Sequence, residues 1–207
     1  MTDWNQRYQT KDTPWDKGEA APPLLEIFVK HEPSLWGNGE ILVPGCGAGH
    51  DVRALSSQGL KPLGLDLAPL ALEIARNQQA AGQETYELGD FLDSEWRQGR
   101  SFSAIWEHTC FCAIHPSQRP KYALACSELI PENGHLIGVF FLTPNGPDEL
   151  DDGPPFNSSI AEIDDHFSTW FERIDSWLPT NCYPGREGKE WIAIYRRKSD
   201  KPQDTDQ

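Results

Sequence analysis

Three glycines at alternate positions, followed by an aspartate at a strand end, are the residues of this chain with the clearest chemical use. Gly45, Gly47 and Gly49 follow an apolar run in ILVPGCGAGHDV at 41–52, and Asp66 ends the next apolar run in GLDLA at 64–68. Such a turn lets a ligand approach the backbone, and such a carboxylate binds ribose hydroxyls. The spacing predicts a site for a nucleoside-containing cofactor. The alternatives are a tight turn without a ligand and a helix cap at Asp66.

The glycine spacing also bears on which cofactor is bound. The dinucleotide pattern is GxGxxG, and its last glycine would fall at His50 in this chain. A pyrophosphate needs that pattern, because it sits on the helix N-terminus. Asp90 and Phe91 follow the third apolar run, where a carboxylate and a ring suit adenine. The alternative there is a capped turn with a core phenylalanine.

Strand and helix patterns alternate along most of the chain. We expect strands at 40–44, 61–67, 84–91, 102–108 and 135–143, with helices at 19–31, 50–59, 69–80, 117–130 and from 160 onward. Two further strands, within 168–178 and 188–198, are joined by a turn. This order predicts a doubly wound α/β fold with a seven-stranded, mostly parallel sheet and an antiparallel hairpin at one edge. Residues 1–198 form one domain, 199–207 a disordered polar tail, and 144–159 an irregular lid or disordered loop.

Composition narrows the partners. The chain has 207 residues and a formal net charge of −14, from 18 basic and 32 acidic residues. That balance argues against nucleic acid, which needs clustered Lys and Arg, and favours a monodisperse monomer. No apolar run approaches the roughly 20 residues that span a bilayer, and the N-terminus lacks signal-peptide features. Five cysteines, without metal-ligand spacing, indicate reduced thiols in the cytoplasm and no metal site.

Five ordered motifs then give a family resemblance over residues 4 to about 191. They are WNQRYQTKDTPWDKG, the ILVPGCGAGHD and GLDLA pair, IWEHTCFCAIHPSQRPKY, GPPF at 153–156, and GREGKEW near the C-terminus. In these the chain resembles the thiopurine S-methyltransferase family and the related thiol and halide methyltransferases. The resemblance implies S-adenosyl-L-methionine as cofactor and a small thiol or related soft nucleophile as substrate. Halide or thiocyanate methylation is an alternative, and a nicotinamide-dependent oxidoreductase or a non-catalytic cofactor sensor are more distant ones.

The resemblance also implies roles for individual residues. Residues 1–18 would be a lid over the cofactor, Glu107 would lie near its amino-acid end, and Arg119 would be catalytic, orienting an anionic substrate. The implied cofactor-binding residues are Trp4, Tyr8, Trp15, Gly45, Gly47, Asp66, Asp90, Phe91 and Glu107, and the implied substrate-binding residues are Arg119, Phe156 and Arg186.

Three positions depart from the patterns of related enzymes. Val43 stands where most methyltransferases of this class have an acid, Phe156 where halide-type members have Tyr, and Glu107 where an aspartate is usual. His108 and His115 could act as bases. A histidine at a strand end more often has a packing role, so neither is assigned to the chemistry.

Overall fold

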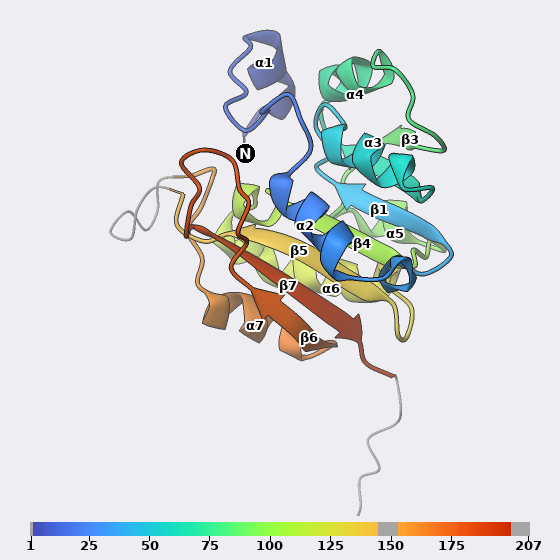
Figure 1. The fold of residues 1–207 in the computed structure, drawn as a ribbon. Helices are drawn as coiled ribbons and strands as arrows, with labels where there is room; N and C mark the ends of the chain where they lie inside the picture. Colours follow the sequence, from blue (N-terminus) through green and yellow to red (C-terminus); the bar gives the residue numbers. More distant parts are fainter. Residues whose placement is uncertain (1, 145–152, 200–207) are drawn as a thin grey trace, which may run out of the picture.

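The computed structural model describes residues 2–144 and 153–199. Its centre is a seven-stranded sheet in the order β3-β2-β1-β4-β5-β7-β6 (Figure 1). The strands are β1 (Glu40–Pro44), β2 (Lys61–Asp66), β3 (Thr85–Leu88), β4 (Ala104–His108), β5 (His135–Phe141), β6 (Phe171–Trp177) and β7 (Glu190–Arg197). The first five strands are parallel, and β7 is antiparallel to both β5 and β6. The predicted fold, including the edge hairpin, is confirmed.

Helices cover both faces of this sheet, as its apolar strands require. They are α1 (Trp4–Gln9), α2 (Pro22–Lys30), α3 (His50–Ser57), α4 (Pro69–Arg76), α5 (Ser94–Arg97), α6 (Arg119–Leu129) and α7 (Ile160–Ser168). Successive residues of β1 point to opposite faces: Ile41 and Val43 pack with α2 and α3, whereas Leu42 packs with α6 and α7. Figure 1 shows α2 and α3 in front of the sheet and α6 and α7 behind it.

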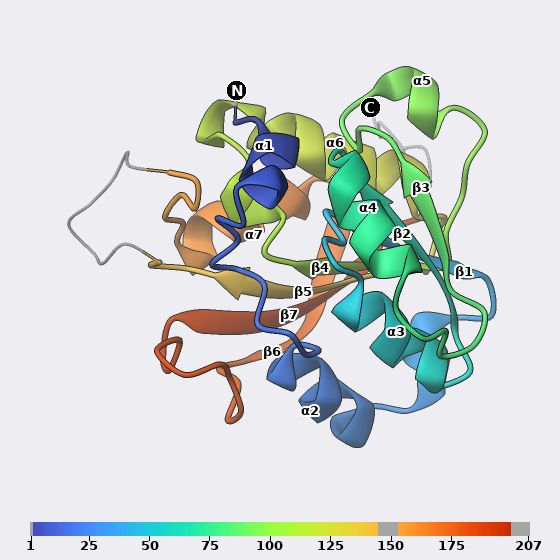
Figure 2. The ribbon, with the colours of Figure 1, turned by 90° about the horizontal axis from the view of Figure 1, so that it is seen from above.

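The N-terminal segment folds back over the carboxyl ends of the parallel strands. Helix α1 packs against α4, and the side-chain oxygen of Asn5 accepts the Leu70 N–H at 3.1 Å. Seen from above, α1 and α4 lie side by side (Figure 2). Because α4 follows β2 directly, this contact places α1 at the end of the sheet where ligands bind in open α/β folds.

The sequence missed some short elements. It did not predict α1, α5 or the 3₁₀ turns at Pro33–Trp36, Phe111–Ala113 and Pro116–Gln118. Half of the loop predicted at 144–159 and nearly all of the predicted tail at 199–207 lie outside the described residues. Within the described ranges, every helix is too short or too polar to cross a membrane.

Candidate cofactor and substrate site

A crevice opens where the chain reverses its direction of winding across the sheet. From β1 the chain continues to β2 and β3, and it then returns to place β4 on the other side of β1. The crevice outside the carboxyl ends of β1 and β4 is the usual ligand site of such sheets. The crevice has a volume of about 60 Å³ and is lined by Tyr8, Trp15, Asp16, Lys17, Glu19, Val43, Gly45, Cys46, Gly47, Ala48, His50, Asp51, His108, Thr109 and Tyr183.

The glycine turn after β1 forms the floor of this crevice. Gly45 and Gly47 have φ angles of +62° and +54°, which favour glycine. A Cβ on Gly47 would lie 2.9 Å from the Tyr8 hydroxyl, so the chain itself approaches the turn closely. The turn uses its amides internally. The N–H of Cys46 donates to the Leu65 carbonyl at 3.0 Å, that of Gly47 to the Asp66 carboxylate at 2.8 Å, and that of Gly49 to the Cys46 carbonyl at 2.9 Å.

Asp66 lies beneath the turn and is 8% exposed. Its Oδ2 accepts the Gly47 N–H, and its Oδ1 accepts the Ala68 N–H at 2.8 Å. Burial raises the pKa of this carboxyl, and the backbone hydrogen bonds from Ala68 and Gly47 oppose the rise. A carboxylate offers about four lone-pair sites. Asp66 can therefore hold the turn and still accept further hydrogen bonds, and its contact with a ribose stays a prediction.

The tips of β2 and β3 lie next to each other and expose apolar side chains. Asp66 pairs with Leu88 in the parallel ladder, and Leu67 and Leu88 are 49% and 53% exposed. Asp90 is exposed beside them, and its carboxylate accepts the Leu92 N–H at 2.7 Å. Leu67 and Leu88 were missed, because a leucine ending an apolar run is indistinguishable from a core residue in the sequence.

Phe91 does not join this exposed surface. It is 5% exposed, and its ring lies 4.7 Å from that of Tyr122 inside the core. This placement agrees with the packing alternative, and the contact of Phe91 with adenine stays a prediction. The sequence could not distinguish the two, because an apolar ring after a strand end serves either use.

The three aromatic residues of the N-terminal segment form one cluster. The Trp4 and Trp15 rings lie 5.4 Å apart, and those of Tyr8 and Trp15 lie 5.9 Å apart, in both cases edge to face. The Trp15 indole N–H donates to the Tyr8 hydroxyl at 3.2 Å. The Arg7 guanidinium lies 4.5 Å above the Trp15 ring, which shows that this indole already receives a cation. The structure thus brings Trp4, Tyr8 and Trp15 into one cluster, of which Tyr8 and Trp15 line the crevice, and their contact with the cofactor stays a prediction.

A polar contact fastens the arm to the helix behind the glycine turn. Nε2 of His50 lies 2.9 Å from Oδ1 of Asp16. Nδ1 of the same histidine lies 2.9 Å from Nη2 of Arg53. Arg53 also donates to the Ala48 carbonyl at 2.9 Å. The histidine at the position of the missing third glycine therefore connects arm, turn and helix.

Glu107 lies at the tip of β4 but faces away from the crevice. It is 1% exposed, and its carboxylate accepts the Phe111 N–H at 2.8 Å and the Tyr122 hydroxyl. Burial raises its pKa to about 7, although these hydrogen bonds oppose the rise. It is not among the residues that line the crevice. In this structure Glu107 holds the turn that follows β4, and its position near the cofactor stays a prediction.

Arg119 is also enclosed by the protein. It is 1% exposed, forms an ion pair with Glu162, and donates to the carbonyls of Phe156 at 3.4 Å and Asn157 at 3.1 Å. Its guanidinium lies 4.8 Å above the Phe111 ring. In this structure Arg119 anchors residues 156–157, and its catalytic role stays a prediction.

Phe156 belongs to this anchored segment, and Arg186 lies just before β7. The N–H of Phe156 donates to the Cys112 carbonyl at 2.7 Å, and its ring lies 5.4 Å from that of His115. Arg186 is 7% exposed, pairs with Glu190 at 2.8 Å and lies 4.6 Å above the Phe141 ring. Neither lines the crevice. Their part in substrate binding stays a prediction.

The crevice contains a histidine–aspartate pair that was not assigned from the sequence. His108 lines it from the end of β4, and its Nδ1 lies 2.9 Å from Oδ2 of Asp51 on α3. The two residues are 57 positions apart, so no local spacing could show the pair.

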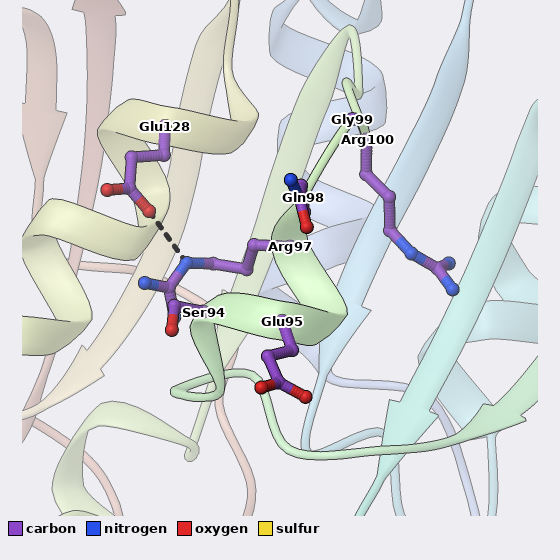
Figure 3. Close-up of a pocket in the computed structure, with 7 residues that line it drawn as sticks. All are labelled: Ser94, Glu95, Arg97, Gln98, Gly99, Arg100 and Glu128. Carbon is purple, nitrogen blue, oxygen red and sulfur yellow. Dashed lines mark hydrogen bonds and ion pairs between the residues drawn. The ribbon is translucent and has the colours of Figure 1, made fainter.

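A second depression, of about 460 Å³, lies between α5 and α6 (Figure 3). It shares no lining residue with the crevice. Two arginines on it are neutralised within the protein: Arg97 pairs with Glu128 at 2.8 Å, and Arg100 pairs with Glu87 at 2.6 Å. The geometry therefore favours the crevice at the glycine turn as the functional site.

Comparison with known proteins agrees with this geometry. Residues 1–177 match the family described as thiopurine S-methyltransferase. Thiocyanate methyltransferase 1 of Brassica oleracea is 32% identical, covering 94% of this chain and 84% of its own length. The probable thiol methyltransferase 2 of Arabidopsis thaliana is 31% identical, covering 95% of this chain and 85% of its own length.

The fold is shared with solved methyltransferases. The N-methyltransferase NodS from Bradyrhizobium japonicum, in complex with S-adenosyl-L-homocysteine, superposes with a TM-score of 0.68 at 13% identity, over 94% of this chain and 98% of its own. A structure described as converting a disulfide bond into a thioacetal group during echinomycin biosynthesis superposes with a TM-score of 0.73 at 21% identity, over 94% and 91% of the two chains. The chain belongs to the thiopurine S-methyltransferase family, whose members transfer a methyl group from S-adenosylmethionine to sulfur.

Proposed function

We propose that this enzyme methylates small thiols or related soft nucleophiles, with S-adenosylmethionine held over the glycine turn. The proposed cofactor contacts are Gly45 and Gly47 at the turn, Asp66 at the ribose, Asp90 at the adenine, and the arm residues Trp4, Tyr8 and Trp15. The exposed side chains of Leu67 and Leu88, beside Asp90, supply an apolar surface for the adenine ring. Phe91 and Glu107 are left out, because both are enclosed by the core.

The observation that carries this proposal is the internal use of the turn's amides. Cys46, Gly47 and Gly49 all donate within the protein, one of them to a carboxylate. A pyrophosphate needs such amides for itself and is repelled by a carboxylate beneath the turn. A sulfonium with an amino-acid chain makes neither demand. The arrangement therefore favours S-adenosylmethionine over a nicotinamide dinucleotide.

The polar and aromatic groups of the crevice suit this cofactor, but the volume of the crevice is too small for it. Ligand pockets for molecules of this size have roughly 300–1,000 Å³, whereas the crevice has about 60 Å³. The Tyr8 hydroxyl lies directly over Gly47. We infer that the arm, residues 1–18, moves outward to admit the cofactor and then closes over it. Its fastening by the Asp16–His50 contact, 2.9 Å long, is polar and reversible.

The protein's part in the reaction is alignment and exclusion of water. When bound, the cofactor supplies an already activated methyl group on a positively charged sulfur. The aromatic arm excludes water and places indole faces beside that charge, an attraction of about 0.5–2 kcal/mol. The glycine turn and Asp66 fix the cofactor's position relative to the open end of the crevice. Holding two reactants in line in this way removes much of the entropic barrier.

Two classes of nucleophile are candidate substrates. Thiols are the main proposal, since family members are thiopurine and thiol methyltransferases. Thiocyanate and halides are the second, because the relative from Brassica oleracea is named a thiocyanate methyltransferase. The two buried arginines bear on this choice. Arg119 and Arg186 are paired with Glu162 and Glu190, so neither offers an uncompensated charge to a small anion. This pairing favours thiols.

Calorimetry tests the cofactor proposal. We expect micromolar binding of S-adenosylhomocysteine and none of NADH. Binding of NADH alone would overturn the proposal. A panel of alkyl thiols, aryl thiols, thiopurines, sulfide, thiocyanate and iodide, followed by mass spectrometry of the methylated product, then ranks the substrates. Cofactor binding without turnover of any member would indicate a sensor.

We also infer that the protein acts as a monomer in a reducing compartment and has no nucleic-acid partner. Its net charge of −14 opposes both self-association and binding to phosphate backbones. All five cysteines are unpaired. Sedimentation analysis at micromolar concentration, with and without single-stranded DNA, tests the first and last of these inferences.

A further inference from the structure

His108 ends β4 at the side of the crevice, and a single carboxylate fixes its ring. Oδ2 of Asp51 lies 2.9 Å from Nδ1 of His108 and also accepts the Trp106 indole N–H at 2.8 Å. Oδ1 of Asp51 accepts the Ala21 N–H at 2.7 Å. Burial alone would raise the pKa of Asp51. The charge and hydrogen bond of His108, together with the hydrogen bonds from Ala21 and Trp106, outweigh burial, so the pKa lies below its usual value. Asp51 is therefore an ionised acceptor.

This acceptor determines the tautomer of the imidazole. An ionised carboxylate only accepts hydrogen bonds, so Nδ1 of His108 carries the hydrogen in the neutral ring. Nε2 then has a lone pair and no hydrogen. That atom is buried and lacks a hydrogen-bond partner within the part of the chain that the structure describes. Enclosing an acceptor without a donor is unfavourable, because the atom loses its hydrogen bonds to water. Such an atom at a ligand crevice is accounted for by a ligand that brings the donor.

The position of His108 suits a proton acceptor for the second substrate. Strand β4 borders the switch point, directly across from the glycine turn. Asp51 on α3 and Tyr183, whose ring lies 6.2 Å from that of His108, flank the imidazole. The nearest ionisable groups are Asp51, Tyr183, Glu107 on its own strand and Arg186 behind Tyr183. The other ionisable groups that line the crevice are Tyr8, Asp16, Lys17, Glu19, Cys46 and His50.

We propose that His108 is a catalytic base, with Asp51 as its positioning residue. This inference rests on the proposed function. In the step, Nε2 of His108 takes the proton of the thiol while a sulfur lone pair forms the new S–CH₃ bond. The bond between the methyl carbon and the cofactor's sulfonium sulfur breaks, and its electron pair stays on that sulfur, which becomes a neutral thioether. The products are the methyl thioether and an imidazolium whose charge Asp51 offsets.

Other candidate bases near the crevice are less suitable. The carboxylate of Glu107 is engaged by Phe111 and Tyr122 on the far side of β4. Burial raises the pKa of the Tyr8 and Tyr183 hydroxyls, so neither is ionised near neutrality. His115 is exposed and hydrogen-bonded to Ser117. Among the described residues, His108 is the histidine that both lines the crevice and has a buried ring nitrogen without a hydrogen-bond partner.

Two substrates that differ only in needing a base give a direct test. An alkyl thiol keeps its proton near pH 7, whereas a nitro-substituted aryl thiol is already ionised. We expect His108→Gln to lower kcat with the alkyl thiol about 10- to 50-fold at pH 7, because only a few per cent of a free thiol is ionised there. Its rate should recover as the pH approaches the thiol pKa of about 8.5. The aryl thiol should lose less than about threefold. His115→Gln is the matched control and should change neither rate.

A spectroscopic readout does not depend on turnover. In ¹⁵N-labelled protein, the His108 signal, identified by its loss in His108→Gln, should show a protonated Nδ1 and an unprotonated Nε2 at pH 8, and Asp51→Asn should remove this preference. An Nε2–H tautomer would overturn the proposal. Equal losses with both thiols, or a loss of S-adenosylhomocysteine affinity in the same proportion, would assign His108 to cofactor binding instead. Absence of methyl transfer by the wild-type enzyme is a separate result, which would overturn the proposed function.

Discussion

The carboxylate of Asp66 and the backbone amide of Gly47 are hydrogen-bonded at 2.8 Å. This contact joins the tip of β2 to the turn that follows β1, so the acid and the glycine turn form one rigid unit. The same carboxylate accepts the Ala68 N–H at the start of α4. The N-cap of α4 is Ala68, so Asp66 holds the residue before the helix without capping it, and it also lies where a ribose would be bound. The two roles are compatible.

Replacing Asp66 should therefore affect both cofactor affinity and stability. We expect Asp66→Ala to weaken S-adenosylhomocysteine binding by about 1–3 kcal/mol, because a hydrogen bond to a charged group is lost. Urea denaturation should show a loss of stability of similar size, since the Gly47 and Ala68 amides lose their acceptor. Asp93→Ala, which removes the cap of the distant α5, is the control and should leave affinity unchanged. Unaltered affinity in Asp66→Ala would remove the residue from the site.

Trp15 should distinguish the charged cofactor from its neutral product. Its ring already accepts the Arg7 cation at 4.5 Å. We expect Trp15→Leu to weaken binding of S-adenosylmethionine by about 0.5–2 kcal/mol more than that of S-adenosylhomocysteine, because only the former carries a sulfonium. Calorimetry with both ligands measures this difference. Trp96→Leu removes a comparable indole, which stacks with Arg100 at 4.3 Å near α5, and should change neither affinity. Equal weakening of both ligands by Trp15→Leu would contradict a role in cation recognition.

Glu107 should make stability depend on pH. Burial raises its pKa from 4.5 to about 7 in the folded protein. The folded state therefore binds more protons than the unfolded state between about pH 4.5 and 7, and this contribution to stability is lost as the pH rises through that window. The full loss is about 3 kcal/mol. We expect Glu107→Gln to flatten the dependence of the unfolding free energy on pH between 5 and 8. An unchanged slope in urea titrations would show that Glu107 is ionised throughout.

Arg119 should contribute to stability and to the position of residues 156–157, which it anchors. Arg119→Leu leaves Glu162 without its partner and releases the carbonyls of Phe156 and Asn157. We expect a loss of about 2–3 kcal/mol, below the range for a fully buried pair because Glu162 is partly exposed.

A matched arginine separates this effect from general destabilisation. Arg97 is also buried and paired with a partly exposed glutamate, but it lies near α5. Arg97→Leu should cost similar stability and leave the KM for thiols unchanged, whereas Arg119→Leu should raise that KM. A fall in kcat with the KM unaltered would instead support the predicted catalytic role of Arg119.

The fold could be predicted because its signals are local. The runs at Glu40–Pro44 and Lys61–Asp66 are continuous and apolar, as strands buried on both faces must be. The glycine turn and Asp66 were likewise placed from spacing alone. The short helix α1 was missed, since its six residues have too little periodicity and Asp3 caps it through a single contact with the Gln6 amide.

The site was harder to predict where it depends on side-chain direction. Glu107 and His108 are neighbours on β4, and successive residues of a strand point to opposite faces. The family resemblance implied that Glu107 lies near the cofactor. In the structure the Glu107 carboxylate accepts a hydrogen bond from Tyr122, whereas His108 lines the crevice. The burial of Arg119 and Phe91 could not be predicted for a related reason: the sequence does not show whether a charged or aromatic residue packs internally or faces a ligand.

Transfer of a labelled methyl group tests the central claim most directly. The enzyme is incubated with S-adenosylmethionine carrying a deuterated methyl group and with the panel of thiols, and the products are analysed by mass spectrometry. The account predicts a thioether that carries the whole CD₃ group, formed in equal amount with S-adenosylhomocysteine. It also predicts that the rate falls together with cofactor affinity in Asp66→Ala. Failure of every thiol to acquire the label, by a protein shown to bind the cofactor, would contradict it.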